Sequence, residues 1–283
     1  MPDPYRRQCR PALGTFVEIA LRADVATDTV FDAAYASIAA VEREMSFHDP
    51  DSTLSRINRA APGAQVALPA LTRTVVRAAL DVHAVTGGLF DCGMGRELVR
   101  RGMLPDPGDC GNGGLAALEL GDHYLTVRAP VCLDLGGIAK GFAVDRAIET
   151  IVAAGVASCI VNAGGDLRVA GSHAAPVAVR DPGAPGSLVP LGDIVDGPVA
   201  TSAPYHSRQG EGADASCALF DPAGVVLMAP RSYTVIAPTC MIADALTKAV
   251  AVAFHRQARP HVSGVVAFHA DFLASFAAQA FIL

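Results

Sequence analysis

The sequence D-L-G-G-I-A-K-G-F-A-V-D-R-A occupies residues 134–147 of this chain, and V-N-A-G-G-D follows at residues 161–166. In the first segment an apolar run ends at Asp134 and a Gly-Gly pair, after which a helical pattern begins with Lys140 in its first turn. Backbone N–H groups at such a turn can approach a phosphate, because the start of a helix favours anions. Two glycine turns with carboxylates and one cation therefore suit a phosphate and its counter-ion. In isolation a Gly-Gly pair is also an ordinary turn, and Asp134 a cap or turn carboxylate.

The order of the periodic segments predicts an α+β fold with a largely antiparallel sheet and packed helices. Apolar residues recur at helical spacing over 31–45, with Thr27 and Asp28 as cap candidates, from Pro69 to the Gly87-Gly88 pair, from 138 to Gly155, and over 241–254. Strand-like runs occupy 13–22, 124–133, 158–161, 176–180, 193–200, 215–220, 231–236 and 262–268. Consecutive strands joined by short turns favour antiparallel pairing over regular βαβ repeats.

Composition excludes several classes of function. The formal net charge of −6, with no basic run, argues against nucleic acid as a partner. The longest charge-free stretch, 150–165, is too short to span a bilayer, so no transmembrane segment is expected. The N-terminal M-P-D-P-Y-R-R-Q-C-R has no apolar segment behind it, which predicts a cytoplasmic protein, or a periplasmic one if an export signal has been removed. The seven scattered cysteines indicate reduced thiols and no zinc site.

Three further segments carry candidate site residues. In A-P-T-C-M-I-A-D-A-L-T-K-A at 237–249, Asp244 lies on an otherwise apolar helix and is either a solvated residue or a ligand of a hard cation such as Mg²⁺. T-G-G-L-F-D at 86–91 presents Leu89, Phe90 and Asp91 together, as a ligand-binding turn or as a helix end followed by a core Phe. His48 lies in a polar loop, where a histidine is solvated unless it contacts a ligand.

Taken in order, these motifs resemble those of the FAD:protein FMN transferase family, often called ApbE. A-L-G-T-F-V-E-I at 12–19, the polar loop at 44–58 and T-G-G-L-F-D match its first motifs, and D-L-G-G-I-A-K-G-F-A-V-D is close to identical with its signature. V-N-A-G-G-D, V-A-T-S at 199–202 and the 237–249 segment follow in the same order. The resemblance implies an ApbE-like, T-fold-like architecture: one domain over residues 1–283, made of two intimately packed lobes with the active site between them.

The resemblance also implies a reaction and its site. FMN is transferred from FAD to a Thr or Ser hydroxyl of an acceptor flavoprotein, with Mg²⁺ as cofactor and AMP as the leaving group. Mg²⁺ would be bound by the Gly137 carbonyl and the Asp244 side chain. The residues at FAD-contacting positions are Leu13, His48, Leu89, Phe90, Asp91, Asp134, Lys140 and Ala218. Two alternatives remain open: hydrolysis of FAD to FMN and AMP, and storage of FAD with little turnover.

The chain departs from the family at two positions. Lys248 stands where the family has a metal-binding Thr, four residues after Asp244, so its ammonium can pair with Asp244 and partly replace the metal. Cys217 stands where the family has a His that helps to activate the attacking hydroxyl, and a neutral thiol is a poor general base. His206 is the nearby candidate to substitute for it. The predicted catalytic set is therefore Asp244, Cys217 and His206, with Lys248 at a metal position.

Overall fold

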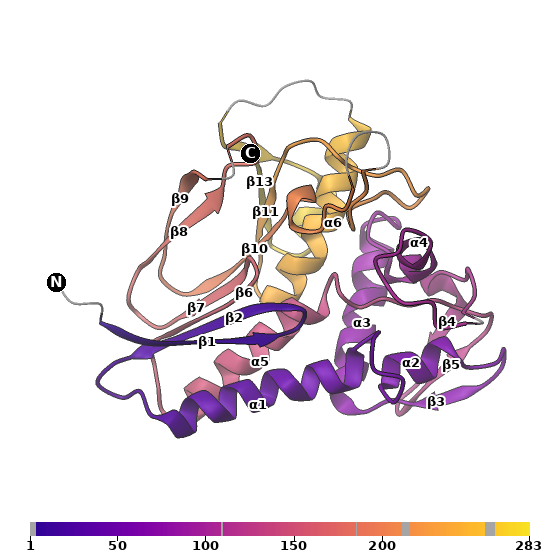
Figure 1. Cartoon of the computed structure of the whole chain (residues 1–283), viewed down its shortest axis with the longest axis horizontal. Coiled ribbons are helices and arrows are strands. Elements are labelled where there is room, and N and C mark those ends of the chain that lie inside the picture. The colour runs from indigo at the N-terminus through magenta and orange to yellow at the C-terminus, as the bar shows by residue number, and fades with distance from the viewer. Residues whose placement is uncertain (1–3, 109, 185, 211–214, 258–263) are drawn as a thin grey trace.

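The large antiparallel sheet is the centre of the fold in this computed structural model, which describes residues 4–108, 110–184, 186–210, 215–257 and 264–283. Its eight strands lie in the order β1-β2-β6-β7-β10-β11-β13-β12, and every pairing between them is antiparallel (Figure 1). The strands are β1 (Tyr5–Ala12), β2 (Thr15–Arg22), β6 (Cys159–Ala163), β7 (Asp166–Ala170), β10 (Gly197–Ser202), β11 (Tyr233–Ile236), β13 (Gln279–Ile282) and β12 (Val266–Phe268). The predicted α+β class with a largely antiparallel sheet is confirmed.

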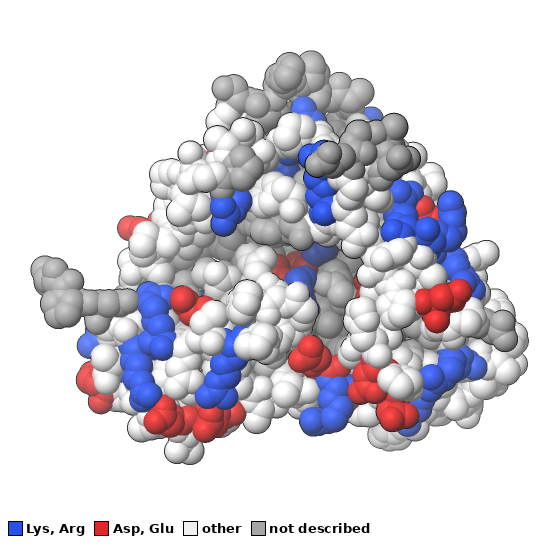
Figure 2. Space-filling model, in the orientation of Figure 1, with Lys and Arg blue, Asp and Glu red and all other residues white. Residues whose placement is uncertain are grey.

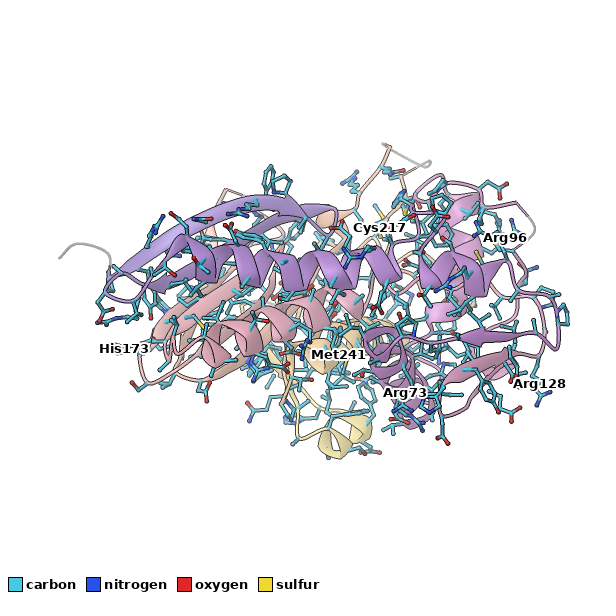
Figure 3. All side chains as sticks on the ribbon, turned by 90° about the horizontal axis from the view of Figure 1, so that it is seen from below. Arg73, Arg96, Arg128, His173, Cys217 and Met241 are labelled. Atoms are coloured by element: carbon cyan, nitrogen blue, oxygen red, sulfur yellow. The ribbon has the colours of Figure 1, made fainter. Side chains whose placement is uncertain are left out.

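Helices cover this sheet and extend beyond it. The long helices are α1 (Asp28–Met45), α3 (Ala70–Val85), α5 (Ala139–Ala153) and α6 (Cys240–Arg256). Helices α5 and α6 contact each other and the strands, and α1 packs on α5 along the long axis of the molecule (Figures 1 and 3). The short helices are α2 (Thr53–Asn58), α4 (Gly95–Arg100) and α7 (Asp271–Ser275). No helix in the described ranges is both long and apolar enough to cross a bilayer.

Two smaller sheets complete the described structure. One contains β3 (Gln65–Ala67), β5 (Tyr124–Val127) and β4 (Leu118–Leu120), and lies with α2, α3 and α4 on the right of Figure 1. The other is the hairpin of β8 (Ala175–Arg180) and β9 (Leu188–Ile194). Three single turns of 3₁₀ helix occur at η1 (Cys92–Met94), η2 (Leu115–Ala117) and η3 (Pro204–His206).

Local periodicity accounts for the elements that were predicted well. Along β2, Val17, Ile19 and Leu21 are fully buried while Phe16 is 71% exposed, as the alternation requires. Helix α1 begins after Thr27, whose hydroxyl accepts from the N–H of Val30, and its predicted apolar face is buried.

Other predicted strands were wrong. The run at 124–133 forms a strand only to Val127, and within 215–220 the described residues make only isolated bridges, Gln209 to Ser216 and Phe220 to Val226. Strands β1, β3, β4, β7 and β13 and most of β9 were not predicted, and residues 262–263 of the predicted strand at 262–268 lie outside the described residues. β1 is an edge strand with three arginines and no fully buried residue, so it lacks the apolar face by which strands are recognised.

Candidate active site

A cavity of about 640 Å³ lies between strands of the large sheet and the segments 45–48, 89–94 and α4. Figure 2 shows the corresponding hollow in the middle of this face, with acidic and basic side chains at its centre. Its lining includes all eight predicted FAD-contacting residues and two of the three predicted metal-site residues, namely Leu13, His48, Leu89, Phe90, Asp91, Asp134, Lys140, Ala218, Gly137 and Lys248. Segments that are distant in the sequence are therefore brought to one site, whose volume is typical of small-molecule pockets.

The hairpin between β1 and β2 presents Leu13 to this cavity. Leu13 and Gly14 form its two-residue loop, and both have positive φ, at 56° and 69°. Such loops match the twist of paired strands, but a leucine there is strained. The Leu13 N–H donates to Glu42 Oε1 at 3.1 Å, so α1 holds the loop in place.

The turn at Asp91 adds an apolar wall and a carboxylate. Phe90 is only 3% exposed, and its carbonyl lies 2.9 Å from His83 Nδ1. The Asp91 carboxylate caps η1, where it accepts from the N–H of Gly93 at 2.7 Å. Phe90 and Asp91 are therefore structural residues that also line the cavity, and contact of this turn with a ligand stays a prediction.

The segment before Asp134 is held by several elements and not by a sheet partner. Asn58 bonds both backbone groups of Leu133: its Nδ2 donates to the carbonyl at 2.9 Å and its Oδ1 accepts from the N–H at 2.7 Å. The Cys132 carbonyl accepts from Gly95, and the N–H of Asp134 donates to the carbonyl of Cys92. This satisfies the buried backbone without a strand, which is why the predicted strand does not reach Leu133.

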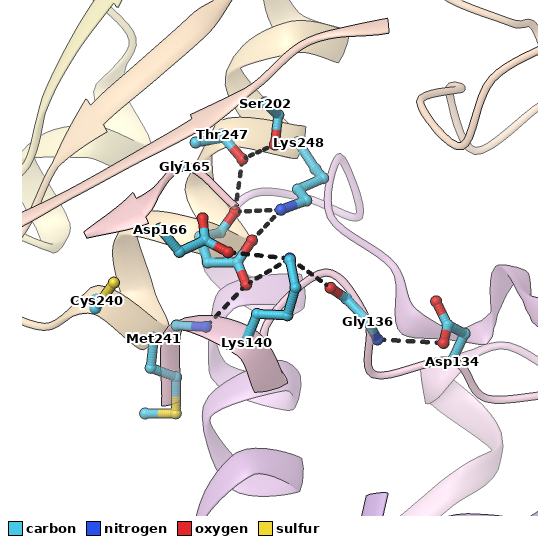
Figure 4. A network of polar contacts seen from close by, with 12 residues as sticks. Asp134, Gly136, Lys140, Gly165, Asp166, Ser202, Cys240, Met241, Thr247 and Lys248 are labelled. Atoms are coloured by element: carbon cyan, nitrogen blue, oxygen red, sulfur yellow. Dashed lines mark hydrogen bonds and ion pairs between the residues drawn. The ribbon is translucent and has the colours of Figure 1, made fainter. Parts of the chain in front are cut away.

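Four charged side chains meet next to the Gly136-Gly137 turn (Figure 4). They are those of Lys140, Asp166, Asp244 and Lys248. Lys140 Nζ lies 3.0 Å from Asp166 Oδ2 and 3.5 Å from Asp244 Oδ2, and it donates to the Gly136 carbonyl at 3.0 Å. Asp244 Oδ2 also accepts from the N–H of Gly141 at 3.2 Å, and its Oδ1 pairs with Lys248 Nζ. The cluster joins α5, β7 and α6, with two ammonium groups against two carboxylates.

Burial and charge act differently on the pKa values of these groups. Burial raises the pKa of Asp166 to about 6, and the neighbouring Asp244 carboxylate adds to that effect. Burial would also raise the pKa of Asp244, but Lys140 and Lys248 hold it below its ordinary value. For Lys140, Asp166 and Asp244 outweigh the effect of burial and raise the pKa. Asp244 is thus an ionised carboxylate held between two cations.

Helix α6 is positioned for this contact at its first turn. The Asp145 carboxylate on α5 accepts from the N–H groups of Cys240 at 3.1 Å and Met241 at 2.9 Å, which satisfies free donors at the helix start. Asp145, Asp166 and Asn58 were not among the predicted site residues. Asp166 could have been found, since it ends the quoted V-N-A-G-G-D motif.

Lys248 contacts both residues predicted to bind magnesium, since its stem lies against Gly137 and its ammonium pairs with Asp244. Asp244 is fully buried, and both of its carboxylate oxygens have lysine partners. Mg²⁺ needs oxygens at about 2.0–2.1 Å in octahedral geometry. Among the described residues no group of three His, Cys, Asp or Glu side chains is spaced to hold a metal ion. The donor set as it stands therefore does not fit Mg²⁺.

Of the remaining predicted catalytic residues, Cys217 lies outside the cavity lining and the side chain of His206 lies outside the part of the structure that is described. Cys217 is fully buried, its thiol lies 3.3 Å from the carbonyl of Leu219, and burial raises its pKa. Cys217 is thus buried outside the cavity lining, and its raised pKa disfavours the thiolate that a base would need.

Comparisons with known proteins agree with this arrangement. The model of the ApbE family matches residues 13–265. A Vibrio cholerae protein named FAD:protein FMN transferase is 27% identical over 236 residues, which are 75% of this chain and 70% of that protein. The solved ApbE protein of Thermotoga maritima has a TM-score of 0.75 at 27% identity, over 88% of this chain and 86% of that one. A mutant of the flavin transferase ApbE from Vibrio cholerae has a TM-score of 0.76 at 24% identity, over 90% and 89%, and supports the fold alone.

Proposed function

This chain belongs to the ApbE family, and from that membership we propose that it is an FAD:protein FMN transferase, an enzyme that moves FMN from FAD to an acceptor flavoprotein. The observation that carries the proposal is the convergence of the family's separate motifs on one cavity, beside a pair of ammonium groups. A diphosphate needs such cations, because charge must be offset as the phosphoryl group is transferred.

The proposed reaction is an in-line displacement at the FMN phosphorus. The oxygen of an acceptor Thr or Ser hydroxyl forms the new bond to phosphorus, the bond to the AMP oxygen breaks, and AMP leaves with that electron pair. The hydroxyl proton passes to a base or to water. In this chain the Gly136-Gly137 turn and Lys140 would orient the diphosphate, and Phe90 and Leu89 would cover the flavin or the adenine.

Mg²⁺ at Gly137 and Asp244 stays a prediction. When bound, a divalent cation would offset charge on the diphosphate. The proposed reaction has no step that depends on this ion, because the Asp244 oxygen that would bind it is paired with Lys248. That residues 1–283 act as one domain of two packed lobes is likewise part of the proposal. It is supported by a cavity whose lining comes from both sides.

The test is an incubation of the protein with FAD and a candidate acceptor domain. The expected result is covalent flavin on the acceptor, detected by in-gel fluorescence and by mass, together with one AMP per flavin transferred. An acceptor variant with Ala in place of its Thr or Ser controls for non-specific attachment. Free FMN and AMP without labelled acceptor would favour hydrolysis, and unchanged bound FAD would favour storage; either result contradicts transfer.

A further inference from the structure

Lysine is almost absent from this protein, and the exceptions are informative. The sequence contains only two lysines, Lys140 and Lys248, and every other cationic side chain apart from histidine is arginine. Both lysines line the same cavity and contact the same carboxylate, that of Asp244. An ammonium is a compact point charge, whereas a guanidinium is a broad planar fork. The chain thus uses the compact cation only where two cations must approach one buried carboxylate.

The position of Lys248 Nζ is defined by oxygen atoms and by the glycine turn. It pairs with Asp244 Oδ1 and donates to the Asp244 carbonyl at 2.9 Å (Figure 4). Its stem lies against Gly137, since a Cβ built there would be 3.3 Å from Lys248 Cε. Within the described part of the chain these two oxygens are its hydrogen-bond acceptors, which leaves one of its three N–H groups for a ligand. The side chain is 23% exposed and faces the cavity, while Asp244 behind it is fully buried.

We propose that the Lys248 ammonium is a built-in cation at the position predicted for Mg²⁺, and that the FAD diphosphate binds there without a divalent metal. Lys248 contacts both residues predicted to bind the metal, because its stem lies against Gly137 and its ammonium pairs with Asp244. Lys248 lines the cavity, whereas Asp244 is fully buried behind it. The identity of the ligand as FAD rests on the proposed function. The source of the cation rests on the geometry of this chain.

The charge of the cluster explains why a metal is not required and not attracted. Two lysines offset the two carboxylates of Asp166 and Asp244, so the cluster is neutral while both are ionised. A divalent ion at Asp244 would have to displace Lys248 from a fully buried partner, which is unfavourable. Replacing Lys248 by a neutral residue would leave a net negative cluster, which repels a diphosphate and attracts a divalent ion.

Thr247 shows that the neighbouring hydroxyl does not serve as a metal ligand here. Its Oγ1 donates to the Asp244 carbonyl at 2.6 Å and lies 2.7 Å from Ser202 Oγ, and Thr247 is fully buried. The hydroxyl is thus already engaged, in line with its turn of about 100° from Lys248 on the helix. A hydroxyl at position 248 itself would take the place of the ammonium.

The first experiment measures FAD affinity by flavin fluorescence in EDTA and in millimolar MgCl₂. For the wild type we expect the Kd to change by less than about 3-fold between the two buffers, because the cation is already present. For Lys248→Thr we expect the Kd in EDTA to rise by about 10-fold or more, the scale of one charge-assisted hydrogen bond, and to recover in MgCl₂. Lys248→Met, which keeps an apolar stem without the charge, should show the same loss in EDTA. Thermal unfolding checks that both variants are folded.

The second experiment observes the lysines directly. With ε-¹³C-lysine labelling the protein has two lysine signals, and the one missing from Lys248→Thr belongs to Lys248. FAD in EDTA should shift that signal, whereas MgCl₂ alone should leave it unchanged. A shift caused by MgCl₂ alone, or wild-type FAD binding that needs Mg²⁺, would overturn the built-in cation and leave the proposed function intact. Absence of FAD binding in both buffers would overturn both.

Discussion

Asn58→Ala is expected to be strongly destabilising, although Asn58 lies outside the lining of the cavity. Its side chain is 4% exposed and bonds both the N–H and the carbonyl of Leu133, a fully buried residue 75 positions away. Truncation to Ala removes the donor and the acceptor together. Because Leu133 directly precedes Asp134, the change should also disturb the glycine turn of the active site.

The expected size follows from the two backbone groups that lose their partners. Each buried N–H or C=O left unsatisfied costs about 1–3 kcal/mol, so we expect the two to lower the unfolding free energy by about 2–6 kcal/mol. That is a large share of a typical total of about 5–15 kcal/mol. The thermal midpoint should fall by roughly 3–10 °C, since the unfolding entropy of a chain of this length is about 0.6 kcal/mol/K. FAD affinity should fall with it at temperatures where the variant remains folded.

The assay is urea and thermal unfolding of wild type, Asn58→Ala and Asn58→Asp. The aspartate variant is the matched control, since its carboxylate still accepts from the Leu133 N–H but faces the carbonyl with a negative oxygen. Its folded-state pKa should be raised, because only the protonated form can donate to the carbonyl. Its stability should therefore be recovered at low pH and lost as pH rises through that value. An Asn58→Ala variant within about 0.5 kcal/mol of wild type would refute the account of this segment.

Three further outcomes are expected. Arg101 donates to Ser216 Oγ at 3.0 Å and to the Gly224 carbonyl at 2.8 Å, and so holds the segment 216–224 in place. Arg101→Ala should therefore speed proteolysis within this segment and raise KM for FAD several-fold. An unchanged rate of cleavage would contradict this role of Arg101. A Cβ on Gly141 would lie 2.2 Å from a carbonyl at the start of α6, so Gly141→Ala should lower the unfolding free energy by about 3 kcal/mol or more. Gly186 has open space around it, so Gly186→Ala is the matched control and should leave the thermal midpoint unchanged. Burial raises the pKa of Tyr35 from 10.0 to about 12, so the neutral phenol contributes fully to stability below pH 10, and this contribution is lost as pH rises towards 12. Denaturation curves of Tyr35→Phe across that pH range should lack this loss of stability.

The family and the order of its motifs could be predicted from the sequence, because both are local patterns. The alternation of β2 and the apolar face of α1 depend on neighbours within a few residues, so they were predicted with their buried residues. The same holds for the glycine turn at Asp134. Strand β1 was missed because at the sheet edge no apolar face is needed, and its charged side chains look like a loop.

Only the tertiary structure decided how the site is held and what cation occupies it. The contact of Lys140 with Asp244 joins residues 104 positions apart, and that of Asn58 with Leu133 joins residues 75 positions apart. Nothing in the local sequence pattern requires either contact. The sequence showed that Lys248 stands four residues after Asp244. Packing of α6 on α5 then fixed Asp244 away from water, so that its charge had to be met by the two lysines within reach. The i, i+4 spacing could predict that Lys248 pairs with Asp244, but burial of the charge and its second partner, Lys140, are properties of the folded chain.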